Sequence, residues 1–135
     1  MDSTDDRFVA AFRDGSLPGE EFPHREHVRM AWLYLERHTT VEALLHFSAD
    51  LRRFATAKGN PALYHETITW AYLLLIAERR ADAPPSESYA AFAARNADLF
   101  AWKPSLLERY YRAETLASPR ARASFLLPDR LATGA

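Results

Sequence analysis

Three histidines are the side chains best suited to chemistry in this 135-residue chain. His24 and His27 are three residues apart, so on a helix both point to the same side. His65 belongs to a second polar segment, which runs from Tyr64 to Thr69. Imidazole is the commonest protein ligand for zinc, iron and copper. The pattern therefore predicts a metal site with His24, His27 and His65 as ligands.

Glu66 extends this prediction towards catalysis. A carboxylate beside histidines gives the mixed ligand set of catalytic zinc and non-heme iron sites, which keep one position open for water or substrate. Glu66 is predicted as a further ligand or as the general base, Thr69 as a group that orients His65 or a bound ligand, and Tyr64 as part of the same pocket. His65 and Glu66 are adjacent, so about 100° separates their directions on a helix. Both reach one ion only if the helix is suitably tilted.

Two other interpretations of these residues stay open. A polar pocket without metal would hold a small molecule, which describes a non-enzymatic binding module. Alternatively, the histidines satisfy backbone or carboxylate partners in a helical interaction protein. The His-x-x-His pattern arises by chance and is less specific than His-Glu-x-x-His, which this chain lacks. Thr67 is interpreted as bonding back to a carbonyl of its own helix.

Other polar residues are interpreted as structural or solvated. His38 and His46 lie outside the paired motifs and are predicted to be surface residues. Glu26 is predicted to be a first-turn carboxylate favoured by the helix dipole. Near the end of the chain, three arginines and one aspartate form a charged cluster that either binds a carboxylate or phosphate or, as we favour, clasps the tail. Its members are Arg120, Arg122, Asp129 and Arg130.

Helices must position these groups, because no run of the sequence alternates in the manner of a strand. Capping residues, prolines and glycines delimit helices at about 4–14, 23–37, 40–58, 61–80, 86–96 and 104–116, followed by a short turn from residue 119. The prediction is a single all-α domain over residues 1–135, a bundle of five to six helices. The last residues, about 131–135, are predicted to fray.

The helix predicted over about 61–80 is placed at the centre of the bundle. Asn60 can cap it, Pro61 suits its first position, and residues 70–77 are apolar in every direction, which is typical of a buried helix. Short connections predict antiparallel neighbours, so the second and fourth helices should run parallel. Their starts carry the histidines and would then share one end of the bundle.

Composition limits the classes of function. Apolar residues make up 48% and charged residues 26% of the chain, as in an ordinary soluble globular protein. The net charge of −1 gives no bulk attraction to nucleic acid or to an anionic membrane. Without cysteine there is no disulfide or thiolate site, and the acidic start lacks the regions of a signal peptide. We expect a cytoplasmic protein with a small-molecule partner, and leave a homo-oligomer open.

Three motifs together give a family resemblance. They are Phe22-Pro23-His24-Arg25-Glu26-His27 with Ala31-Trp32, then Tyr64-His65-Glu66-Thr67-Ile68-Thr69, and finally Ala121-Arg122 with Phe125 and Pro128-Asp129. The chain resembles a family of small bacterial proteins, usually labelled uncharacterised, that share F-x-H-x-x-H-x-x-x-A-W and Y-H-E-T-x-T. The resemblance spans roughly residues 22–130. It implies an all-helical fold and assigns no reaction.

Overall fold

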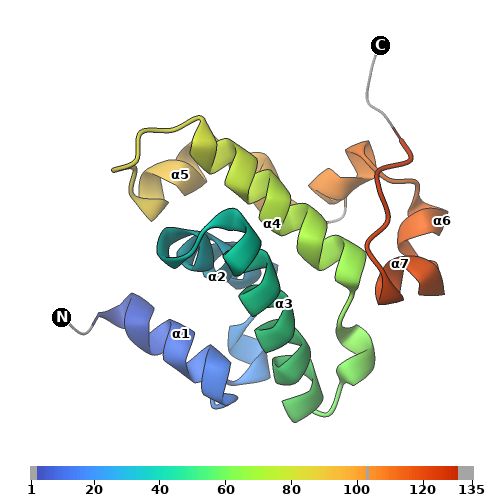
Figure 1. The fold of residues 1–135 in the computed structure, drawn as a ribbon, viewed down its shortest axis with the longest axis horizontal. Helices are drawn as coiled ribbons and strands as arrows, with labels where there is room; N and C mark the ends of the chain where they lie inside the picture. Colours follow the sequence, from blue (N-terminus) through green and yellow to red (C-terminus); the bar gives the residue numbers. More distant parts are fainter. Residues whose placement is uncertain (1–2, 103, 131–135) are drawn as a thin grey trace. The chain divides into compact units, whose positions relative to one another are not determined.

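The computed structural model describes residues 3–102 and 104–130. Within these ranges the protein has seven α-helices, four short 3-10 turns and no strand, which confirms the all-α prediction (Figure 1). The chain divides into two compact units, Met1–Tyr64 and His65–Ala135. None of the helices in the described ranges has the length and apolar content needed to span a bilayer. The predicted fraying at 131–135 falls outside the described residues.

The first unit holds three long helices, α1 (Thr4–Asp14), α2 (His24–Arg37) and α3 (Thr40–Ala57), with 3-10 turns at Gly19–Glu21 and Pro61–Leu63. Their ends follow the predicted signals. The Ser3 side chain accepts a hydrogen bond from the Asp6 amide, and Gly15 closes α1 in the left-handed region at φ 82°. Thr39 and Glu42, which are three residues apart in the sequence as a capping box requires, form that box at the start of α3.

Aromatic rings form the core of this unit. The Phe12 ring of α1 is 1% exposed. Its centroid lies 5.1 to 6.1 Å from the rings of Phe22, Tyr34, Phe47 and Phe54. These residues come from α1, the chain before α2, α2 itself and α3, so the ring cluster joins all three helices.

The apolar spacing in the sequence of α3 predicts that Val41 and Leu45 face inwards and that Asp50 lies on the solvated side. Both predictions are wrong. Asp50 is only 6% exposed, whereas Val41 and Leu45 are 68% and 64% exposed. The buried face of α3 runs through Ala43 and Phe47 at a spacing of four, and residues two positions away fall on the other side of a helix.

The second unit is built on α4 (Glu66–Ala81) and continues through α5 (Tyr89–Arg95), α6 (Ala113–Leu116) and α7 (Pro119–Ala123). Helix α4 begins at Glu66 rather than at Pro61, because the His65 side chain caps it and Pro61–Leu63 forms a separate 3-10 turn. The helix expected over 104–116 is also interrupted. A 3-10 turn at Leu106–Arg109 is separated from α6 by the extended backbone of Arg112, at ψ 149°.

Helix α4 organises this unit. The turn at Leu106–Arg109 and helix α7 both pack against it. Its buried residues include Thr67, Leu73 and Ile76, each essentially without exposed surface. The Trp70 ring stacks on Phe125, with centroids 5.2 Å apart. Leu74 is 37% exposed, so the apolar run of α4 is not buried in every direction.

Candidate functional site

His65 is held at both ring nitrogens. Its Nδ1 accepts a hydrogen bond from the Ile68 amide at 3.1 Å, and its Nε2 lies 2.7 Å from the carbonyl oxygen of Leu116. A carbonyl only accepts and an amide N–H only donates, so these partners assign the proton to Nε2 and leave Nδ1 bare. Burial and the nearby charge of Arg122 lower the pKa of His65, although its bond to Leu116 opposes them. A metal ion at His65 would have to replace one of these two bonds.

Thr67 makes an equally complete set of bonds. Its side chain is fully buried, and its hydroxyl donates to the Ser124 carbonyl at 2.7 Å while accepting from the Leu126 amide at 3.1 Å. The predicted bond to a carbonyl of its own helix is therefore wrong. Thr67 is structural, but it fixes chain that lies 57 residues away in sequence.

The chain from Arg112 to Arg130, which we call the C-terminal segment, has further anchors. The Tyr111 hydroxyl donates to the Leu126 carbonyl at 2.7 Å. The Asp129 carboxylate accepts from the Arg112 amide at 3.0 Å and from the Thr115 hydroxyl, and these two bonds lower the pKa of Asp129. The Arg130 amide donates to the Tyr110 carbonyl at 2.9 Å. Asp129 and Arg130 thus help to clasp the tail through hydrogen bonds with the backbone and with Thr115.

An open hollow of about 470 Å³ lies on this segment. Its lining combines one cation, two acids, two hydroxyls and two leucines, namely Arg120, Glu114, Asp129, Thr115, Ser118, Leu126 and Leu127. Ligand sites in proteins commonly have about 300–1,000 Å³. Thr115, Ser118 and Asp129 already bond within the segment, whereas Glu114 and Arg120 are exposed.

The other two predicted metal ligands lie on the first turn of α2, in the first unit. His27 is half-buried and stacks on Phe22, with ring centroids 4.0 Å apart. Burial lowers its pKa to about 4, and the charge of nearby His24 adds to this effect. A hydrogen bond to the Phe22 backbone acts in the opposite direction. His27 is therefore neutral at pH 7.

His65 belongs to the second unit, so a metal site that brings the three histidines together stays a prediction. Taken unit by unit, the described residues contain no group of three or more His, Asp or Glu arranged to hold a metal ion.

The remaining predicted site residues also divide between the units. Tyr64, in the first unit, is 8% exposed, and the Arg52 guanidinium lies 4.6 Å from its ring centroid. Glu66 is the half-buried first residue of α4. Thr69 is 8% exposed, and its amide donates to the His65 carbonyl at 3.0 Å. Glu66 and Thr69 therefore share the first turns of α4 with His65.

Glu26 lies on the first turn of α2, as predicted, but it is half-buried and forms an ion pair. Its carboxylate accepts from the Arg29 guanidinium at 3.2 Å. The same guanidinium donates to Asp5 of α1 at 2.6 Å. This network ties α1 to α2.

The sequence interpretation missed two pairings in the first unit. The Tyr34 hydroxyl donates to the buried Asp50 carboxylate at 2.6 Å. The rings of His38 and His46 lie 4.8 Å apart. The capping box at Thr39 could have indicated the second pairing, because it fixes a tight reversal between the two histidines.

Comparisons of the chain with family models, with curated proteins and with solved structures find no match. The resemblance carried by the three motifs stays a prediction. Any function has to be argued from the geometry of the two units.

Proposed function

We propose that this protein is a non-enzymatic module that binds a small molecule in the hollow of its second unit. One observation carries the proposal. His65 and Thr67 bond to the backbone of the C-terminal segment, and that segment lines the hollow. The motif residues then act by shaping a site rather than by reacting with a substrate.

The lining indicates the chemistry of the ligand. Arg120 suits a carboxylate or phosphate group, because a guanidinium binds both through paired hydrogen bonds. Glu114 and Asp129 suit an ammonium group, and the two leucines suit an apolar portion. A small zwitterion with an apolar side chain satisfies all three requirements.

Thermal-shift screening followed by calorimetric titration tests the proposal. The library contains small zwitterions, carboxylates, phosphates and amines. We expect a zwitterion to stabilise the protein and the Arg120→Gln variant to lose that binding. Arg25→Gln is the matched control, since Arg25 is an exposed arginine of the first unit. Failure of every compound to bind, or unchanged binding by Arg120→Gln, would contradict the proposal.

A metal-dependent enzyme remains the second candidate. His24 and His27 share the first turn of α2, and the neutral form of imidazole is the one that binds metals. In this proposal His65 completes the ligand set, Glu66 acts as ligand or base, and iron, zinc or copper activates water or oxygen. Elemental analysis after anaerobic loading tests it, on protein without a histidine tag. About one equivalent of metal, lost on His27→Ala, supports this candidate, and no retained metal contradicts it.

A further inference from the structure

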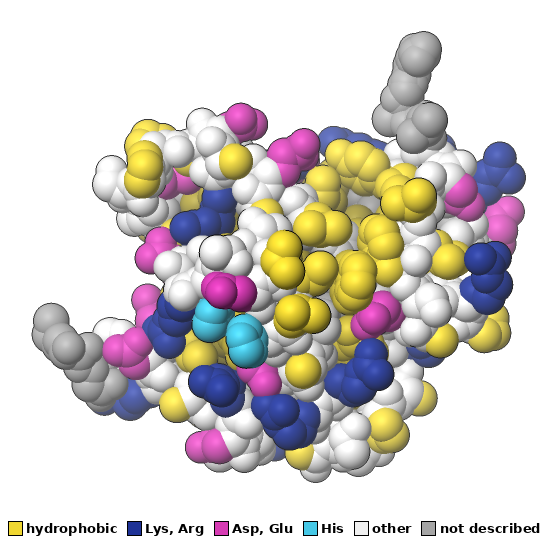
Figure 2. Space-filling model, in the orientation of Figure 1, with side chains coloured by type: hydrophobic (Ala, Val, Ile, Leu, Met, Phe, Trp, Pro, Cys, Tyr) yellow, Lys and Arg dark blue, Asp and Glu magenta, His cyan; other side chains and the backbone are white. Residues whose placement is uncertain are grey.

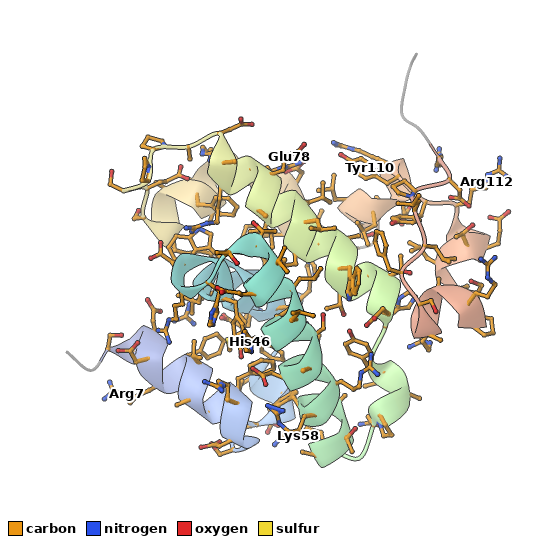
Figure 3. The ribbon with its side chains drawn as sticks, viewed as in Figure 1. Arg7, His46, Lys58, Glu78, Tyr110 and Arg112 are labelled. Atoms are coloured by element: carbon orange, nitrogen blue, oxygen red, sulfur yellow. The ribbon has the colours of Figure 1, made fainter. Side chains whose placement is uncertain are left out.

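A pair of histidines that does not belong to the predicted metal site lies on the surface of the first unit. His38 is the C-cap residue that follows α2, and His46 lies on α3. Their ring centroids are 4.8 Å apart, with 31° between the ring planes. Figure 2 shows two histidine side chains in contact on the face viewed, where Figure 3 labels His46.

The spacing of these rings suits a shared metal ion. Zinc–nitrogen bonds of about 2.0–2.1 Å at a tetrahedral angle place the centroids of two ligating imidazoles about 5 Å apart. The observed separation of 4.8 Å is close to that value. Both rings are accessible, because the His38 side chain is 34% exposed and His46 is an exposed residue.

The local structure holds the pair in place. The Thr39 hydroxyl accepts from the Glu42 amide at 3.2 Å, and the Glu42 carboxylate accepts from the Thr39 amide at 3.0 Å. This capping box fixes the connection between the two histidines. It also holds a carboxylate oxygen 4.0 Å from His38 Nδ1, which adds negative charge beside the pair. Glu42 and His46 are four residues apart and share a face of α3.

We propose that His38 and His46 form a two-histidine surface site for a divalent transition metal, with copper bound most tightly. Imidazole nitrogens suit copper, nickel and zinc, and copper heads the affinity order for such ligands. Water completes the coordination, so the site needs no third protein ligand. It is independent of the hollow in the second unit and of the histidines at positions 24, 27 and 65.

Titration with Cu(II) alone tests this site, on the full chain without a histidine tag. The parent chain is compared with His38→Ala, His46→Ala and the control Arg25→Gln, which replaces an exposed residue outside every proposed metal site, and circular dichroism checks that each variant is folded. We expect affinity to fall at least about tenfold in the two histidine variants and to stay unchanged in Arg25→Gln. Electron paramagnetic resonance should show two equatorial imidazoles in the parent chain and one in His46→Ala.

Two results would overturn the site. One is a His46→Ala variant that binds Cu(II) as tightly as the parent chain. The other is a parent-chain spectrum that is unchanged in His46→Ala, which would place the metal away from this pair. If His38→Ala unfolds, the spectrum of His46→Ala decides alone, because His46 is an exposed residue.

Discussion

The Nε2 of His65 donates to the carbonyl oxygen of Leu116 across 2.7 Å, and this bond joins the start of α4 to the end of α6. The two residues are 51 positions apart in sequence. The other ring nitrogen of His65 caps α4 through the Ile68 amide. One imidazole therefore caps the start of α4 and anchors the C-terminal segment at the same time.

Replacing His65 should destabilise the protein. His65→Ala removes a helix cap and leaves a carbonyl without its partner, which should together lower the free energy of unfolding by about 2–3 kcal/mol. His65→Asn keeps a capping side chain and should lose about half as much. Urea unfolding measures both values. Equal stability of His65→Ala and the parent chain would contradict a structural role.

Thr67 should matter through its hydroxyl rather than its size. Thr67→Val keeps the shape of the side chain but leaves the Ser124 carbonyl and the Leu126 amide unpaired, with an expected cost of about 2–3 kcal/mol. Thr67→Ser retains the hydroxyl and should cost less. Hydrogen exchange gives a local readout, since the Leu126 amide should lose protection in Thr67→Val only. Unchanged exchange at Leu126 would contradict the bond.

Acid should weaken the fold through His27. Its pKa of about 4 in the folded protein lies below the ordinary value of 6.5, so the folded state favours the neutral imidazole. The resulting stability is complete above about pH 6.5 and is lost as the pH falls towards about 4. The lowered pKa of His65 acts in the same direction.

The matched variant for this effect is His27→Gln, which cannot titrate. Urea unfolding of the parent chain and of His27→Gln at pH 7 and pH 5 should show a smaller loss in the variant. Parallel losses in the two proteins would assign the acid sensitivity to other groups.

The buried carboxylate of Asp50 should depend on its tyrosine partner. Tyr34→Phe removes the hydroxyl that donates to Asp50 at 2.6 Å. The carboxylate then keeps only its hydrogen bond from Arg53 and its ion pair with Arg13, whose nitrogen lies 3.6 Å away. We expect a loss of about 1–3 kcal/mol in the free energy of unfolding. Burial and Asp50 both raise the pKa of Tyr34, so an ultraviolet titration should show one tyrosine fewer that ionises only on unfolding in Tyr34→Phe than in the parent chain. Ionisation of Tyr34 with the exposed tyrosines would contradict the pairing.

The sequence by itself determined the helical class and the ends of several helices. These features depend on neighbours in the chain, such as Ser3 with Asp6, Gly15 in its left-handed conformation, and Thr39 with Glu42. A cap works within one helical turn, so it can be recognised from spacing alone. Asn60 and Pro61 misled for the same reason, because they begin a 3-10 turn whose local signal resembles that of a helix.

Only the tertiary structure decided what the polar residues do. The partners of His65 and Thr67 lie 51 and 57 residues away, and no local pattern records such distances. The sequence predicts Asp50 to be solvated, because it does not show that the Tyr34 hydroxyl of another helix donates to the Asp50 carboxylate. Residue types establish which groups can bond or ligate, whereas burial and long-range partners establish which of them remain available for a ligand.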